Sequence, residues 1–266
     1  MSPFRTGRRA AAAVVTAALL VPLAACGKDD AKTDKSAEKS GGKTATAELT
    51  VLAASSLTDV FKKAGAAYEK DHPGTKVKFS FAGSQELAAQ VKQGAPADAL
   101  VTADSRTMDG LKADAGTPIV IAHNRLVIVT GEGNPKKVHT LKDLTDSKLK
   151  VVLAAPEVPV GRYGKQVLDA QKLKVAPVSQ EPNVRAVLSK VELGEADAGL
   201  VYKTDAATAP KKVDAIDIPD QQNAVAAYPA ATLKTSKHAA AAAAFVKWLS
   251  TPEAQKILKD AGFQKP

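Results

Sequence analysis

The feature that most constrains the fold of this chain is an alternation of strand-like and helix-like segments from residue 48 to the C-terminus. Short apolar runs typical of buried strands alternate with runs whose apolar residues recur every three or four positions, as on an amphipathic helix. After the apolar run at 48–53, for example, Leu57, Phe61, Ala64 and Tyr68 would share one helical face. Repeated β-α-β units predict an α/β fold with largely parallel sheets and helices on both faces.

The same patterns predict the individual elements. We expect strands at 48–53, 76–81, 97–102, 125–130, 150–155, 198–201, 213–218 and 224–228. We expect helices at 57–68, around 87–91, at 163–171, at 184–192, in the Ala-rich segment that ends near 249, and after Pro252. Pro252 stands at the first position of the last helix and Gly262 just past its end, where these residue types are favoured.

The first 26 residues predict the compartment. Three arginines among the first nine residues, an apolar run at 10–20 and a lipobox-like motif at 23–26 are typical of a bacterial lipoprotein signal. We therefore predict a signal peptide at 1–25, cleaved before Cys26, which would carry acyl chains on its sulfur and its new amino group. The alternative is a plain secretory signal with an unrelated cysteine. Either way the chain would act outside the cytoplasm.

The segment at 26–46 is polar and rich in Lys, Asp, Ser, Gly and Thr, so we expect a flexible tether that links the lipid anchor to the folded part. Two or more acyl chains would hold the protein stably at the cell membrane. The net charge is +9, but the lysines are scattered, and we expect no nucleic-acid partner.

Enzyme and metal motifs are missing. The four histidines share no ligand spacing, and Cys26 is the only cysteine. The serine-hydrolase, phosphate-loop and zinc-protease motifs are also absent. We therefore expect a protein that is not an enzyme and has neither a cofactor nor a directly bound metal ion.

Two serines follow predicted strands directly and open predicted helices: Ser56 and Ser84. A helix N-terminus carries unsatisfied N–H groups and partial positive charge, so such a turn favours an anion. Helix capping explains the same residues, because Ser56 with Asp59 fits a capping box and Ser84 could be an ordinary N-cap. The spacing alone therefore indicates only a possible anion site.

At these residues the sequence resembles the molybdate-binding proteins of ABC importers, over about residues 50–264. Six segments match motifs of that family in the family's order: Ala54 to Asp59 (ASSLTD), Phe81 to Ser84 (FAGS), Gly94 to Asp98 (GAPAD), Pro156 to Tyr163 (PEVPVGRY), Asn183 to Arg185 (NVR) and Gly199 to Ala206 (GLVYKTDA).

The resemblance implies a type II periplasmic-binding-protein fold, with two α/β lobes and a ligand cleft between them. Lobe one would comprise 47–124 plus 229–266, and lobe two would comprise 125–228.

The resemblance also implies the ligands of the anion. They would be the hydroxyls of Ser56, Ser84 and Tyr202 and the backbone N–H groups of Val160 and Val184. Val160 departs from the alanine usual in the family, but only its N–H would be used. Arg185 lies beside a ligand position, and its role as a surface charge, a bridge between lobes or a help to the anion stays open.

The implied function is capture of molybdate or tungstate for an ABC importer, with the permease and its ATPase as partners and a monomeric binding protein. Molybdenum would be bound as its oxyanion. One alternative keeps the fold and changes the ligand to sulfate, phosphate or an organic acid. Another is a secreted esterase or phosphatase that uses Ser56 or Ser84, which would need a histidine base within reach.

Overall fold

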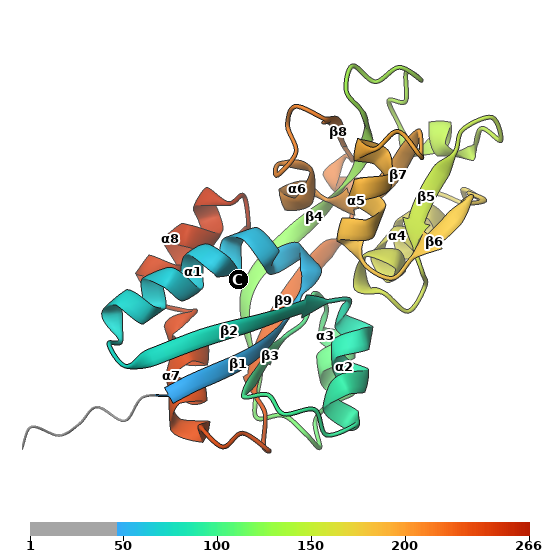
Figure 1. Ribbon diagram of the computed structural model, residues 1–266. Coiled ribbons are helices and arrows are strands. Elements are labelled where there is room, and N and C mark those ends of the chain that lie inside the picture. Colours follow the sequence, from blue (N-terminus) through green and yellow to red (C-terminus); the bar gives the residue numbers. More distant parts are fainter. Residues whose placement is uncertain (1–46) are drawn as a thin grey trace, which may run out of the picture. The chain divides into compact units, whose positions relative to one another are not determined.

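The computed structural model describes residues 47–266 (Figure 1). The predicted signal peptide at 1–25, the lipid-carrying Cys26 and the predicted tether at 26–46 lie outside the described residues. Within 47–266, no helix combines the length and the apolar character needed to cross a membrane.

Residues 47–266 form a nine-stranded sheet. Its order is β2 (Thr75–Ala82), β1 (Ala47–Ala54), β3 (Ala99–Val101), β9 (Val225–Thr232), β4 (Ile119–Gly131), β7 (Ala198–Tyr202), β5 (Val151–Ala154) and β6 (Ser179–Glu181), and β8 (Val213–Asp217) pairs with β4.

The long strand β4 changes partners along its length. Its residues 119–125 pair with β9, whereas its residues 126–130 pair with β7 and its residues 127–131 pair with β8. β4 therefore joins a first half of the sheet, made of β2, β1, β3 and β9, to a second half made of β7, β5, β6 and β8.

The prediction of largely parallel sheets is wrong. β1 is parallel to β2 and β3, and β5 is parallel to β6 and β7. The pairs β3–β9, β4–β9, β4–β7 and β4–β8 are antiparallel. The physical reason is that β4 runs from the first half into the second and β9 returns beside it, so the two strands must have opposite directions.

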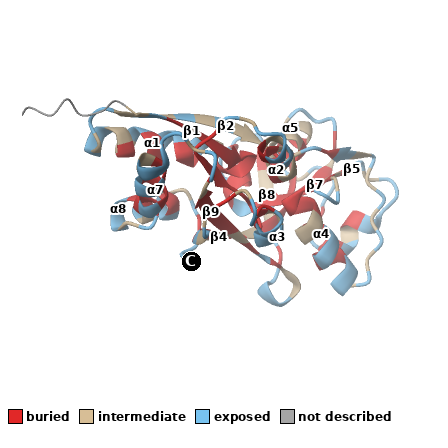
Figure 2. Ribbon diagram, turned by 90° about the horizontal axis from the view of Figure 1, so that it is seen from below, coloured by how far each residue is buried: buried red, intermediate tan, exposed pale blue. Residues whose placement is uncertain are grey.

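Helices cover both faces of the first half (Figures 1 and 2). The neighbours Val51 and Leu52 of β1 point to opposite faces, and they belong to separate core clusters. Val51 shares its cluster with Phe61 of α1 (Thr58–Asp71) and Phe245 of α7 (Ala239–Trp248), and α8 (Pro252–Asp260) packs on α1. Leu52 shares its cluster with Leu87 of α2 (Ser84–Lys92) and with the region of α3 (Ser105–Asp109).

In the second half, α4 (Pro159–Ala170) and α5 (Val184–Glu192) pack against β5 and β7. The short helices are η1 (Ser55–Leu57), η2 (Leu141–Thr145), α6 (Lys203–Ala206) and η3 (Asp220–Gln222). The bounds predicted for α5 are confirmed. α4 begins four residues before the predicted start at 163, because Pro159 occupies its first position, where proline is favoured.

The first turn of α4 lies close against the end of β5. A Cβ atom added to Gly161 would stand 2.1 Å from the backbone oxygen of Ala155, a distance that no side chain tolerates. Glycine at this position therefore lets the start of α4 approach the edge of the sheet, and it places the N–H groups of that turn beside the neighbouring helix starts.

Candidate functional site

A small pocket lies where the two halves of the sheet meet. It is lined from the first half by the residues around η1 and the start of α2, and from the second half by the starts of α4 and α5 and by the end of β7. The cavity is small. The space in which the centre of a water molecule fits measures only about 10 Å³, and this excludes ligands of metabolite size. The pocket has room for one ion of a few atoms.

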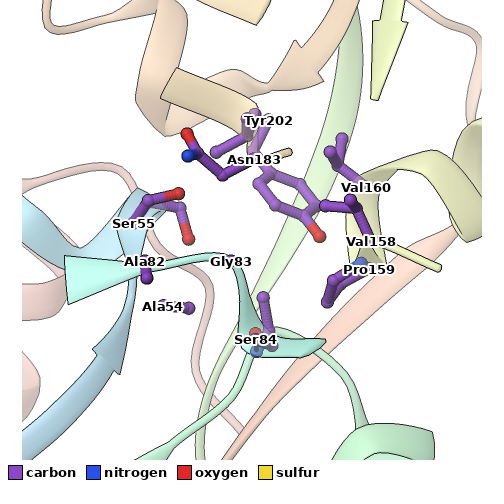
Figure 3. Close-up of a pocket in the computed structure, with 13 residues that line it drawn as sticks. Ala54, Ser55, Ala82, Gly83, Ser84, Val158, Pro159, Val160, Asn183 and Tyr202 are labelled. Atoms are coloured by element: carbon purple, nitrogen blue, oxygen red, sulfur yellow. Dashed lines mark hydrogen bonds between the residues drawn. The ribbon is translucent and has the colours of Figure 1, made fainter. Parts of the chain in front are cut away.

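All five residues implied by the resemblance line this pocket. Ser56 and Ser84 come from the first half, and Val160, Val184 and Tyr202 come from the second. Figure 3 shows the ring of Tyr202 reaching into the space bounded by Ser84 and the start of α4. The structure brings the predicted residues together, and their binding of a ligand stays a prediction.

The pocket offers donors and no formal charge. Val160 is the second residue of α4 and Val184 the first of α5, so their N–H groups belong to the first turns, which have no partner within the helix. Of the described residues that line the pocket, none is charged and none is a histidine. Partial positive charge at the helix starts faces the cavity.

The capping interpretation of the two serines is wrong. Gly83 is the N-cap of α2 and Ser84 is the first helical residue, whose Oγ accepts a hydrogen bond from the N–H of Ala103 at 3.0 Å. The hydroxyl of Ser56 makes no capping bond and pairs with the hydroxyl of Tyr228 at 3.0 Å. Tertiary partners have therefore replaced the local ones, and one of the two lone pairs of Ser84 Oγ is already occupied, which leaves its hydrogen free to be donated.

Tyr202 supplies the one hydroxyl in this group without a partner. Its side chain is 1% exposed, and the hydroxyl makes no hydrogen bond to any described residue. Burial raises the pKa of Tyr202 well above its ordinary value, so the hydroxyl keeps its hydrogen. A buried donor of this kind needs an acceptor, which a ligand in the pocket would provide.

Arg185 lies just outside the pocket and links the two halves. One guanidinium nitrogen lies 2.7 Å from Asp59 of α1, and Nε donates to Asp205 at 2.5 Å. Burial raises the pKa of Asp205 to about 6, because the loss of water outweighs the attraction of Arg185. Of the roles left open for Arg185, the structure shows the bridge.

Sequence reasoning missed two further links between the halves. Nε of Arg162 in α4 donates to Asp104, the N-cap of α3, at 2.8 Å, and another guanidinium nitrogen donates to Thr107 at 2.7 Å. The side-chain amide of Gln85 donates to the carbonyl of Pro182 at 2.8 Å. Arg162 lies inside one of the matched motifs, but its partner is 58 residues away, and no local pattern predicts that pairing.

The described residues also hold no group of three or more His, Cys, Asp or Glu side chains that could bind a metal ion.

Comparisons with known proteins agree with this geometry. Residues 49–264 match the model of a family described as bacterial extracellular solute-binding protein. The chain belongs to this family. The molybdate-binding protein ModA of Mycobacterium tuberculosis is 39% identical over 256 residues, which cover 95% of this chain and 97% of that protein. The resemblance to molybdate-binding proteins is thereby confirmed.

One further relative and one solved structure give information on the location and the fold. The putative ABC transporter substrate-binding lipoprotein YvgL of Bacillus subtilis is 33% identical, covering 94% of this chain and 95% of that protein. The solved structure of the periplasmic molybdate-binding protein of Azotobacter vinelandii superposes with a TM-score of 0.71 at 23% identity, covering 82% of this chain and 99% of that one. This likeness confirms the predicted type II periplasmic-binding-protein fold.

Proposed function

We propose that this protein captures molybdate outside the cytoplasm and delivers it to an ABC importer. The observation that carries the proposal is the convergence of five neutral hydrogen-bond donors, from both halves of the sheet, on one ion-sized pocket. The relatives that are named for molybdate binding supply the substrate.

The donor set suits a tetrahedral oxyanion. A fully deprotonated dianion only accepts hydrogen bonds, and the serine and tyrosine hydroxyls and helix-start N–H groups can all donate. Burying such an ion without a counter-charge is costly unless its oxygens are satisfied. Donors on both sides of the pocket supply that satisfaction, and the helix starts add a favourable field.

We further propose that the halves act as two lobes, 47–124 plus 229–266 and 125–228, that close on the anion. An anion that contacts donors on both lobes favours the closed arrangement over an open one. The pairs of Arg185 with Asp59 and of Arg162 with Asp104 would form as the lobes meet.

The rest of the proposal concerns anchoring and partners. A lipid on Cys26 would hold the protein near a membrane permease and its ATPase, and the tether would raise its effective concentration there. Membership in an extracellular solute-binding family and the lipoprotein name of one relative support this placement. We expect the protein to act as a monomer.

Calorimetric titration of the mature protein with molybdate, tungstate, sulfate and phosphate tests the function. We expect molybdate, and tungstate as an anion of nearly the same size and the same charge, to bind much more tightly than sulfate, in keeping with the relatives that are named for molybdate binding. A preference for sulfate would reassign the substrate within the same fold. The absence of binding to all four anions would refute the oxyanion site.

A further inference from the structure

A chain of buried polar groups lies directly behind Ser56. The hydroxyl of Tyr228, on β9, is 3.0 Å from Ser56 Oγ, and Nδ2 of Asn124, on β4, lies 3.4 Å from the Tyr228 oxygen. The same Nδ2 donates to Thr204 Oγ1 at 2.8 Å. Asn124, Thr204 and Tyr228 are at most 4% exposed. None of these three residues lines the pocket, so their role is not contact with a ligand.

The directions of these hydrogen bonds follow from the amide of Asn124. Its Oδ1 accepts from the N–H of Arg125 at 2.9 Å, which fixes the orientation of the amide and turns Nδ2 toward Tyr228. Because Nδ2 can only donate, the Tyr228 oxygen accepts. Among the described residues Ser56 Oγ is the one acceptor within hydrogen-bond distance of the Tyr228 hydroxyl, so we assign Tyr228 as the donor to Ser56. Burial, which raises the pKa of Tyr228, keeps that hydrogen in place.

The consequence appears at Ser56. An oxygen that accepts from Tyr228 through one of its two lone pairs has its own hydrogen left for the pocket. Its second lone pair diverges from the O–H bond, so a Ser56 hydroxyl that directs its hydrogen at a ligand turns that lone pair away from it. Ser84 is held in the same state by the backbone N–H of Ala103, which substitution of a side chain cannot remove. Of the two serines, only Ser56 has a hydroxyl whose hydrogen-bond direction depends on another side chain.

We propose that Tyr228, oriented by Asn124, is a positioning residue that fixes Ser56 as a donor and selects tetrahedral oxyanions without a hydrogen over those that carry one. This inference rests on the proposed oxyanion function. Molybdate, tungstate and sulfate need only donors. The monohydrogen phosphate dianion carries one O–H group, which needs an acceptor. A Ser56 hydroxyl that accepts from Tyr228 and directs its hydrogen into the pocket has its remaining lone pair turned away from the ligand and does not serve as that acceptor.

The first test is Tyr228→Phe, titrated with molybdate and with inorganic phosphate at a mildly alkaline pH, where phosphate is mainly the monohydrogen dianion. We expect molybdate affinity to fall about tenfold, because Ser56 loses its fixed direction. Phosphate affinity should hold or rise, because the freed Ser56 oxygen can accept its hydrogen. The ratio of molybdate affinity to phosphate affinity should therefore fall by tenfold or more. Equal changes in both affinities, or no change, would overturn the proposal.

A matched control and a second variant separate this role from mere packing. Tyr68→Phe removes another buried tyrosine hydroxyl, in the core beside Phe245 and Trp248, and should leave both affinities unchanged. Asn124→Asp places an acceptor opposite the Tyr228 hydroxyl, draws its hydrogen away from Ser56 and should lower the same ratio with the tyrosine intact.

A double-mutant cycle locates the effect. In a Ser56→Ala background, Tyr228→Phe should change neither affinity, because Tyr228 acts through Ser56. Fully additive losses would show that Tyr228 acts elsewhere. If the unmodified protein binds none of the oxyanions, the proposed function fails. If it binds molybdate and the ratio is the same in Tyr228→Phe, only the positioning role fails.

Discussion

Replacing Tyr202 with phenylalanine should affect the free and the ligand-bound protein in opposite ways. In the free protein the hydroxyl is buried without a partner, so its removal leaves the free energy of unfolding unchanged or raises it. The phenylalanine ring keeps the edge contact with Tyr228, whose ring centroid lies 5.9 Å away. In the bound protein the variant loses a hydrogen bond to a charged acceptor, worth about 1.5–3 kcal/mol. Affinity for molybdate should fall roughly ten- to a hundredfold.

Two measurements check this prediction together. Calorimetric titration gives the affinity, and thermal unfolding with and without molybdate gives the stability of each state. We expect Tyr202→Phe to unfold at the same or a higher temperature than the unmodified protein without ligand, and to gain much less from added molybdate. An unchanged affinity would remove the hydroxyl from the site. A loss of stability in the free protein that matches the loss on binding would show that the hydroxyl is structural.

Three more substitutions follow from the contacts. Asp59→Asn removes the ion pair with Arg185 that links the halves, while Asp205 still pairs with the arginine. In titrations, molybdate affinity should fall a few-fold at low salt and stay unchanged at high salt. A loss of affinity that does not depend on salt would contradict an electrostatic role for this pair. Burial raises the pKa of Asp205 from 3.8 to about 6, so the folded state binds this proton more readily than the unfolded state. In denaturant titrations the free energy of unfolding of the unmodified protein, compared with that of Asp205→Asn, should fall as the pH rises from about 4 to 6. An increase over this pH range would refute the prediction. Gly161→Ala should displace the first turn of α4, cost about 1–3 kcal/mol in denaturant titration and weaken binding, whereas Gly131→Ala, where an added Cβ meets nothing within 4 Å, should bind normally.

The sequence predicted elements well where one periodicity persisted. Residues 184–192 show a clear helical repeat between Asn183 and Leu193, and α5 has those bounds. β4 was half missed, because the polar residues at 123–125 separate its first apolar run, at 119–122, from the run at 126–129 and hide the continuity of the strand. Its antiparallel pairing with β9 joins residues about a hundred positions apart, and local patterns carry no information on such contacts.

The candidate site was predicted by resemblance and not by spacing. Periodicity placed Ser56 and Ser84 at helix starts, and that position alone favoured capping. What each hydroxyl contacts depends on the folded chain: Ser56 meets Tyr228, 172 residues away, and Ser84 meets the backbone of Ala103. A polar residue in a strand that otherwise reads as buried, such as Asn124 or Tyr228, is the signal that could have pointed to the network behind the pocket.

The distribution of charge around the pocket indicates that affinity and selectivity depend on different residues. The arginines nearest the pocket, Arg185 and Arg162, are each paired with a carboxylate of the other half, so they add little net field inside the cavity. The pocket itself presents only dipoles and hydrogen-bond donors, whose effect on a buried ion is short in range and poorly screened by salt. Selection among oxyanions should therefore depend on the direction of hydroxyl hydrogens and survive high ionic strength. Of the two ion pairs between the halves, that of Arg162 with Asp104 is largely buried, whereas that of Arg185 with Asp59 is partly exposed, and the contribution of the latter pair should decline with salt. Affinity and selectivity would then respond to different residues, Asp59 on one side and Tyr228 on the other.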